Sequence, residues 1–223
     1  MAPRNKAPVA SLTRERIVRT ALEIVDREGL AALSMRRLGA ELGVDPMAAY
    51  YHIPNKEALL DAIVEAVMAE IDLGSDDPSA PAEERIVNAA RAYRDVMLAH
   101  ANALPIVLTR GPTTPGAMRP VELLIGILRD AGLPPTQALA GMNAVAAAVR
   151  GTVAMVADNH GAPRTPEELA ALSESFPAGE FPNLRELVLC PPDFLGSDFE
   201  FGVRALARGL LGALPGAGVT STP

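Results

Sequence analysis

The residues best suited to chemistry are concentrated in one segment near the N-terminus. Residues 34–56 read SMRRLGAELGVDPMAAYYHIPNK. Two adjacent arginines stand near the start of this segment, and two tyrosines, a histidine and a lysine stand near its end. Guanidinium, hydroxyl, imidazole and ammonium groups donate hydrogen bonds to phosphate oxygens and to the edges of bases. The residue types therefore predict contacts with DNA.

Two short helices are expected to position these side chains. Ser34 is a candidate N-cap for a helix over 35–42, and Gly43 interrupts that helix. Asp45 is a candidate N-cap for a second helix that begins with a proline and reaches about His52. Two short helices joined by a glycine-containing turn predict a helix-turn-helix, whose second helix enters the major groove of DNA.

The same segment resembles the N-terminal signature of the TetR family of transcriptional repressors. Residues 33–63, LSMRRLGAELGVDPMAAYYHIPNKEALLDAI, contain its Leu-Ser opening, LGV turn, aromatic pair followed by histidine, and N-K-E-x-L-L ending. The resemblance implies a repressor that binds operator DNA and is released by a small molecule. The residues expected to contact DNA are Ser34, Met35, Arg36, Arg37, Pro46, Met47, Tyr50, Tyr51, His52 and Lys56.

These residues have different expected roles. Arg36 suits bidentate hydrogen bonds to guanine O6 and N7, and a phosphate contact is an open alternative. Arg37 is expected to face the DNA backbone or solvent, and Met47 to touch thymine methyl groups. Tyr50 is expected to share its ring with the core while its hydroxyl reaches a phosphate. The resemblance implies that Lys56 clamps a phosphate at the start of the fourth helix.

Composition and periodicity predict an all-α chain. Hydrophobic residues make up 49% of the sequence and aromatic residues only 4%, so the core must consist of aliphatic side chains, many of them helix formers. Thr165 with Glu168, and Ser197 with Glu200, have the spacing of a capping box. The predicted helices cover about 14–28, 35–42, 46–52, 56–71, 82–101, 105–109, 116–131, 135–158, 166–174, 183–189 and 198–214.

Composition also suggests the domain boundaries. The segment DLGSDDPSAP, residues 72–81, is a predicted linker. Before it we expect a disordered arm (1–10) and a three-helix helix-turn-helix DNA-binding domain with its connecting helix (11–71). After it we expect a helical ligand-binding and dimerisation domain (82–214) and a short tail (215–223).

The C-terminal part is similar to the tetracycline-repressor subgroup in two stretches, 98–112 and 199–214. That resemblance implies a pocket for a small-molecule effector between helices. The candidate lining residues are Met68, Tyr93, Met97, His100, Leu104, Met118, Leu123, Met142, Asn143, Ala146, Arg150 and Phe176. Val107 occupies the place of the subgroup's metal-binding histidine, so neither a tetracycline–magnesium effector nor any other cofactor or metal is expected.

Arg150 interrupts the apolar run AVAAAVRGTVAMVA. A charge in such a run must be paired or must face a cavity or solvent. A salt bridge to an acidic side chain at a dimer surface and an ion pair with a carboxylate ligand both remain open.

Small residues recur every three or four positions along two of the predicted helices. Packed against a second copy, the two stripes would form a four-helix dimer interface, and close packing within one chain is the alternative. The stripes consist of Gly141, Ala144, Ala148, Gly151 and Met155 on one helix, and Gly202, Ala205, Gly209 and Gly212 on the other.

The distribution of charge, the single cysteine and the absence of long apolar runs limit which classes of protein the chain can belong to. The net charge is −7, but residues 1–60 hold nine basic and seven acidic residues, whereas the remainder holds eleven basic and twenty acidic ones. A slightly basic head on an acidic body favours one orientation on DNA. The single cysteine, Cys190, excludes an intrachain disulfide. The sequence has neither an apolar run of about 18 residues nor a signal-peptide core. It therefore predicts a cytoplasmic protein without a membrane partner.

Two other functions stay open. An enzyme would require catalytic residues outside the common motifs, since the chain has no G-x-S-x-G, H-E-x-x-H, CxxC or glycine-rich phosphate loop. A ligand-independent DNA-binding factor would bind DNA without release by a small molecule.

Overall fold

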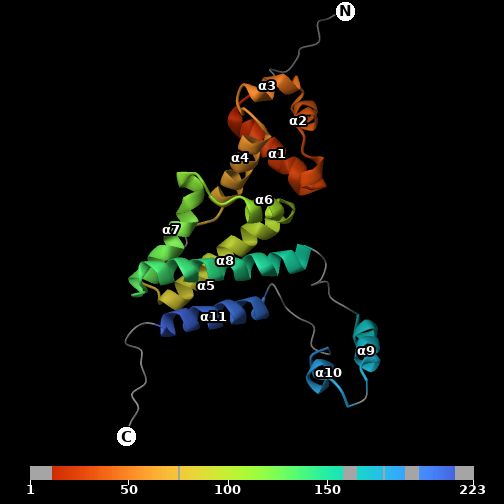
Figure 1. Ribbon diagram of the computed structural model, residues 1–223, viewed down its shortest axis with the longest axis vertical. Helices are drawn as coiled ribbons and strands as arrows, with labels where there is room; N and C mark the ends of the chain where they lie inside the picture. Colours follow the sequence, from red (N-terminus) through yellow and green to blue (C-terminus); the bar gives the residue numbers. More distant parts are fainter. Residues whose placement is uncertain (1–11, 75, 158–164, 178, 189–195, 214–223) are drawn as a thin grey trace, which may run out of the picture. The chain divides into compact units, whose positions relative to one another are not determined.

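The structure is a computed structural model that describes residues 12–74, 76–157, 165–177, 179–188 and 196–213. All regular elements within these ranges are helical, which confirms the predicted all-α class (Figure 1). The predicted N-terminal arm and C-terminal tail, and Cys190, lie outside the described residues. The elements are α1 (Arg14–Glu28), η1 (Leu30–Ala32), α2 (Met35–Leu42), α3 (Pro46–Tyr50), α4 (Lys56–Ala69), α5 (Ala82–Ala99), η2 (Ala101–Ala103), α6 (Leu104–Thr109), α7 (Pro115–Asp130), α8 (Pro135–Ala157), α9 (Pro166–Ser175), α10 (Pro182–Val188) and α11 (Ser197–Gly212).

Side-chain caps account for several helix starts. The Thr13 hydroxyl accepts the Arg16 N–H at 3.2 Å at the start of α1. Thr165 and Glu168 form the predicted capping box of α9. The prediction that Ser197 caps α11 is wrong, because the helix starts one residue earlier than the pattern indicated and Ser197 is its first helical residue.

The chain divides into two compact units that do not follow chain order. The first unit contains Met1–Asp72 and Ala99–Pro120, and the second contains Leu73–Leu98 and Val121–Pro223. The segment 99–120, expected in the C-terminal domain, therefore packs with the DNA-binding helices. A hydrogen bond from the Asn102 amide to the Asp26 carbonyl at 2.8 Å is one of the contacts that hold it there.

Aliphatic side chains form the core of the first unit. Ile17 and Ile24 of α1, Leu38 of α2, and Leu59 and Ile63 of α4 are completely buried. The two residues of α1 are seven positions apart and the two of α4 are four apart, so one face of each of these helices turns inward. Burial of such side chains contributes about 1.5–3 kcal/mol each and fixes α2 relative to α1 and α4.

In the second unit, α8 lies beside α11 (Figure 1). A Cβ atom on Gly141 would lie 3.2 Å from a Leu128 methyl and 3.3 Å from both Leu210 methyls, so this glycine serves close packing within the chain. At Gly141 the predicted alternative to a dimer contact, close packing within one chain, therefore applies. Among the described helices only α8 has the length and apolar composition of a membrane span, which core helices of soluble proteins share.

An ion pair joins the predicted linker to α5. The Arg85 guanidinium donates two hydrogen bonds to the Asp76 carboxylate, at 2.9 and 2.8 Å, and both side chains are nearly buried. The hydrogen bond from Arg85 lowers the pKa of Asp76. The first residues after the unit boundary are therefore attached to the helix that follows them.

We expect Asp76→Asn to lower the free energy of unfolding of the second unit by about 1–3 kcal/mol, because a bidentate charge-assisted contact is lost. Thermal unfolding at neutral pH measures this. Since the pKa of Asp76 is lowered by folding, its contribution is present above the ordinary value of 3.8 and is lost as pH falls through the folded value. Asp95→Asn is the matched control, because Asp95 is exposed and pairs with its neighbour Arg94; an equal loss in both variants would contradict the assignment.

Candidate functional site

Backbone geometry builds the predicted helix-turn-helix from α2 and α3. The Ser34 hydroxyl accepts the Arg37 N–H at 3.1 Å, and the Asp45 carboxylate accepts the Met47 N–H at 2.8 Å. Between them Gly43 adopts a left-handed conformation with φ of 69°, which favours glycine. Each helix therefore has the cap that its sequence predicted, and the turn has the residue that its backbone requires.

Gly39 allows α2 to approach the start of α3, and the sequence pattern did not single it out. A Cβ atom at Gly39 would lie 3.0 Å from the Pro46 Cα atom and 3.1 Å from the Val44 carbonyl oxygen. Both neighbours are backbone atoms, which cannot swing aside. The available signal was a glycine inside a short helical pattern, which often marks close packing.

The described side chains of α3 and the turn after it divide between core and surface. Ala49 is completely buried, while 64% of Met47 and 90% of Tyr51 are exposed. Tyr50 is 37% exposed. The helix ends at Tyr50, before the predicted His52, because the His52 N–H bonds to the Ala49 carbonyl in a tighter final turn.

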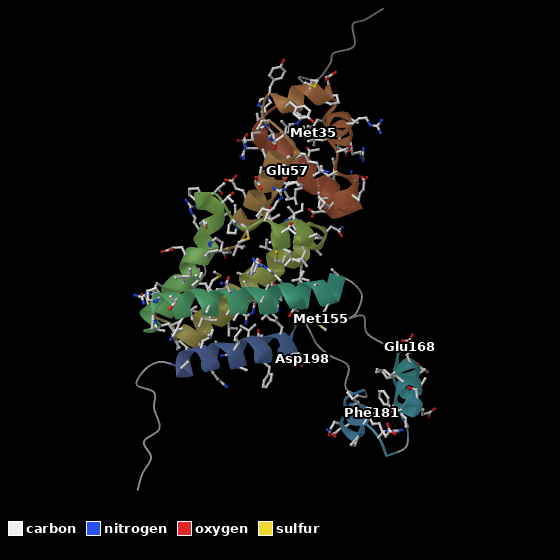
Figure 2. All side chains as sticks on the ribbon, in the orientation of Figure 1. Met35, Glu57, Met155, Glu168, Phe181 and Asp198 are labelled. Carbon is white, nitrogen blue, oxygen red and sulfur yellow. The ribbon has the colours of Figure 1, made fainter. Side chains whose placement is uncertain are left out.

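Arg36 is available for an outside partner. Its side chain is exposed. It follows Met35, the first residue of α2, which Figure 2 labels. Within the described part of the chain it makes neither a hydrogen bond nor an ion pair. An arginine with all its N–H groups open to solvent can form the bidentate contact expected of it.

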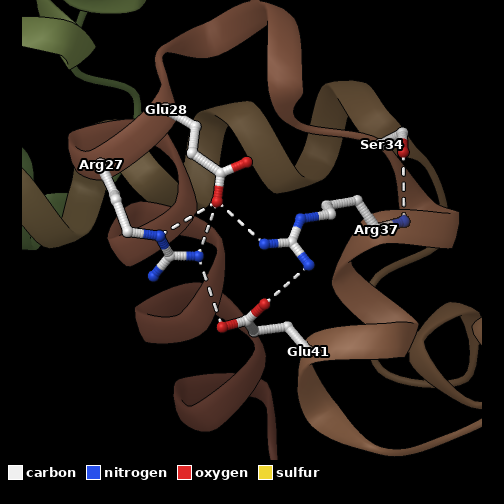
Figure 3. Close-up of polar contacts among 5 residues, drawn as sticks. All are labelled: Arg27, Glu28, Ser34, Arg37 and Glu41. Atoms are coloured by element: carbon white, nitrogen blue, oxygen red, sulfur yellow. Dashed lines mark hydrogen bonds and ion pairs between the residues drawn. The ribbon is translucent and has the colours of Figure 1, made fainter.

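The adjacent Arg37 is instead committed to other side chains of the first unit (Figure 3). Its guanidinium lies 2.8 Å from a Glu28 oxygen and 2.9 Å from a Glu41 oxygen. Arg27 contacts the same two carboxylates, at 2.8 and 3.4 Å. Hydrogen bonds from Arg37 and Arg27 lower the pKa of Glu28. The network joins the end of α1 to α2, so the structure gives Arg37 a positioning role.

Lys56 and Ser34 keep donors for phosphate while they make internal contacts. The Lys56 ammonium donates to the Leu33 carbonyl at 3.1 Å and has two further N–H groups. The Ser34 hydroxyl accepts one hydrogen bond and retains its own O–H donor. The remaining predicted contacts, Pro46 and His52, lie at the two ends of α3.

Arg110, just after α6, holds two carboxylates of α4. It lies 2.6 Å from the Asp61 carboxylate and also pairs with Glu57, which Figure 2 labels at the start of α4. Hydrogen bonds with Asp61 and Glu57 raise the pKa of Arg110. The first two turns of α4 are thereby attached to α6 within the first unit.

His100 joins the ends of α1 and α4. Its Nδ1 atom lies 2.8 Å from an Asp26 carboxylate oxygen, and its Nε2 atom lies 2.9 Å from a Glu70 oxygen. Burial lowers the pKa of His100, but the hydrogen bonds with Glu70 and Asp26 outweigh this effect and raise it overall. With both ring nitrogens engaged, His100 has no free nitrogen for a ligand.

The other candidate effector residues fall in both units. Met68 and Leu104, with the exposed Met118, belong to the first unit. Met97 is completely buried in the second unit, and Phe176 packs against Phe181 with ring centroids 6.0 Å apart. Four further candidates of the second unit lie on α7 and α8, namely Leu123, Met142, Asn143 and Ala146.

Of the second unit's candidates, Tyr93 and Arg150 are brought into direct contact. The Arg150 Nε atom donates to the Tyr93 hydroxyl oxygen at 2.7 Å, and the guanidinium lies 5.8 Å from the centre of the Tyr93 ring. The two residues are 57 positions apart on α5 and α8. Spacing along the chain could not predict this contact.

Comparison with known proteins identifies the family. The model of the N-terminal domain of bacterial regulatory proteins of the tetR family matches residues 17–63, which contain the whole of α2 and α3. The model of the tetracycline repressor-like C-terminal domain matches residues 77–213. The chain belongs to the tetracycline repressor (TetR) family.

Individual TetR-family relatives agree with this result. The transcriptional repressor DrrR1 of Streptomyces coeruleorubidus is 34% identical over 133 residues, 58% of this chain and about half (48%) of its own length. The class D tetracycline repressor of Escherichia coli is 28% identical over 90% of each chain. The structure of ActR from Streptomyces coelicolor in complex with actinorhodin has a TM-score of 0.78 and 32% identity, and the match covers 92% of this chain and all of that one.

The two adjacent arginines of α2 are expected to differ sharply when each is replaced by alanine. Arg36→Ala removes an open side chain and should weaken specific DNA binding by roughly 1–3 kcal/mol without changing the melting temperature. Arg37→Ala breaks the ion pairs with Glu28 and Glu41 and should lower the melting temperature. Fluorescence anisotropy with DNA and thermal unfolding measure the two effects; equal melting temperatures for both variants would refute the positioning role of Arg37.

His100 should make the stability of the first unit depend on pH. Because its pKa is raised by folding, its stabilising contribution is complete below the ordinary value of 6.5 and declines as pH rises through the folded value. Thermal unfolding across this range should show a fall that His100→Gln removes. His52→Gln, which replaces an exposed histidine, should keep the fall; its disappearance there would point to a different titrating group.

Proposed function

We propose that the chain is a ligand-responsive transcriptional repressor that binds operator DNA as a homodimer. A small molecule bound to the C-terminal domain releases it from the operator. The observation that carries this proposal is the surface of the helix-turn-helix, on which Arg36 is exposed and has no partner among the described residues, and on which Met47 and Tyr51 are also exposed. Membership of the TetR family supports the same function.

Arg36 supplies the base-reading contact, and the groups around it hold the DNA backbone. Tyr51, His52 and Lys56 offer donors to phosphates, while Met47 offers an apolar contact to thymine methyl groups. Since α3 contains no Arg, Gln or Asn, part of the specificity comes from the shape and deformability of the operator.

Exposed faces of α8 and α11 support dimerisation. Ala148, Gly151 and Met155 on α8 are exposed, and a Cβ atom added at Gly202 or Gly209 of α11 meets no other atom within 4 Å. Such faces let helices of a second copy approach closely. The two DNA-binding domains of one dimer can occupy operator half-sites about 34–36 Å apart.

Release follows from a shift between two arrangements of the dimer. Arg110 attaches α6 to Glu57 and Asp61 of α4, and the start of α4 is attached to the helix-turn-helix by Lys56. A movement of α6 is therefore transmitted to the DNA-binding surface. The effector must bind the released arrangement more tightly, so equal affinity for the free and the DNA-bound protein would exclude this mechanism.

The effector is proposed to be a small organic molecule, and the protein to act in the cytoplasm without catalysing a reaction. ActR, which shares the fold over its whole length, was solved with actinorhodin, and DrrR1 is a transcriptional repressor. In the described part of the chain no group of three His, Cys, Asp or Glu side chains is arranged to hold a metal ion.

The test is fluorescence anisotropy with the DNA immediately upstream of the protein's own gene, at fixed salt. The wild-type chain should bind this DNA more tightly than a shuffled duplex, and Arg36→Ala should remove most of the difference. Arg208→Ala is the control for loss of one positive charge, because Arg208 is exposed on α11 and pairs with Glu83. Failure of the wild type to bind any duplex at low salt would overturn the proposal.

The dimer is tested by a substitution on the exposed face of α11. Gly209→Arg should convert the dimer to a monomer in light-scattering measurements and weaken operator binding, because the new side chain separates the two copies. Gly126→Arg is the control, since an added Cβ atom at Gly126 of α7 also meets nothing within 4 Å of this chain. A dimer that persists in Gly209→Arg would exclude this face as the interface.

A further inference from the structure

We propose that Arg150 and Tyr93 form the recognition site for a carboxylate, so that the effector is an organic acid with an apolar body. This inference rests on the proposed function, because it specifies the chemical class of the effector. It is carried by the hydrogen-bonding groups that the two side chains leave open.

Arg150 carries a charge into an apolar stretch of α8. Its side chain is partly buried, and Val149 and Val153, its neighbours along the helix, are completely buried. A guanidinium in such surroundings loses part of its hydration and requires compensating partners.

The described part of the chain supplies one such partner. The Arg150 Nε atom donates to the Tyr93 hydroxyl at 2.7 Å, which uses one of five N–H groups. Among the described residues no carboxylate lies within ion-pair distance, and the four N–H groups of the two terminal nitrogens make no hydrogen bond. These four groups form the planar fork that binds a carboxylate bidentately.

Tyr93 adds a further donor to the same set. Its hydroxyl oxygen accepts from Arg150, so its own O–H remains available. The pair therefore offers several donors, one positive charge and no strong acceptor. A group that accepts hydrogen bonds and carries a single negative charge satisfies all of them.

Most of the described arginines of the second unit differ from Arg150 in having a carboxylate partner. Arg85, Arg91, Arg94, Arg204 and Arg208 each lie within ion-pair distance of a carboxylate of the same unit. Arg129 and Arg185, like Arg150, have none among the described residues, but their guanidinium groups donate to backbone carbonyls instead.

One guanidinium selects a monoanion over a phosphate dianion. Arg94, the nearest arginine to Tyr93 in the sequence, pairs with Asp95 and lies 4.5 Å from the centre of the Phe199 ring, so it is committed elsewhere. Neutralising a single charge requires a single carboxylate. The apolar residues of α8 on either side of Arg150 favour a hydrophobic body on that acid.

The probe is 2-naphthoate, compared with the neutral and nearly isosteric 2-naphthamide, in isothermal titration calorimetry on the full chain. The wild type should bind 2-naphthoate at least roughly tenfold more tightly than 2-naphthamide. Arg150→Gln should weaken 2-naphthoate binding by a similar factor and leave 2-naphthamide unchanged. Tyr93→Phe should produce a smaller loss, and the control Arg208→Gln should behave as the wild type.

Three binding results would overturn the inference. The first is equal affinity of the wild type for 2-naphthoate and 2-naphthamide, and the second is unchanged 2-naphthoate binding in Arg150→Gln. The third is the lack of saturable 2-naphthoate binding up to about 10 mM, a concentration that corresponds to only weak affinity. Light scattering gives an independent check. A monomeric Arg150→Gln would mean that Arg150 pairs with a carboxylate of a second copy, which also overturns the inference.

These failures are distinguishable from failure of the proposed function. Binding to upstream DNA by the wild type without any probe tests the repressor alone. Operator binding without 2-naphthoate binding would refute only the effector class. Binding of 2-naphthoate through Arg150 without DNA binding would refute the repressor and keep the site.

Discussion

The close approach of α2 to the start of α3 is the constraint on which the DNA-facing surface depends. It requires the absence of a side chain at Gly39, because the backbone at Pro46 and Val44 occupies the space of a Cβ atom. With the two helices in contact, Leu38 and Ala49 are buried and the polar side chains are left on the outer surface. The left-handed Gly43 then sets the direction in which α3 leaves the turn. Packing at one glycine thus determines which residues of the helix-turn-helix face outward.

Ion pairs between arginines and carboxylates join several of the helices to one another. Arg37 joins α1 to α2, Arg110 joins α6 to α4, and Arg85 joins the linker to α5. In each case a carboxylate compensates the desolvation of the guanidinium. Neither Arg36 nor Arg150 has a carboxylate partner within the described ranges, and each lies where an outside ligand is proposed.

The division into units has a consequence for signalling. The segment 99–120 lies between helices of the second unit in the sequence but packs with the DNA-binding helices. His100, Asn102 and Arg110 all contact residues of the first unit. Under the proposed mechanism, a movement of this segment would act on α1 and α4 through contacts within the first unit.

Local chemistry was sufficient to determine the helices and the family from the sequence. The caps at Thr13, Ser34, Asp45 and Asn55 act within three residues, and apolar periodicity acts within a helix, so both can be read along the chain. The same is true of the helix-turn-helix and its exposed residues. Only the tertiary structure showed that Arg37 forms ion pairs with carboxylates whereas Arg36 is exposed. It also showed that the backbone at Pro46 leaves no room for a side chain at Gly39. The contacts of His100 with Asp26 and Glu70, and of Arg150 with Tyr93, likewise came from the structure. Most of these contacts join different helices, several of them far apart in the sequence, and they depend on which side chains meet in three dimensions. The spacing of residues along the chain does not contain that information.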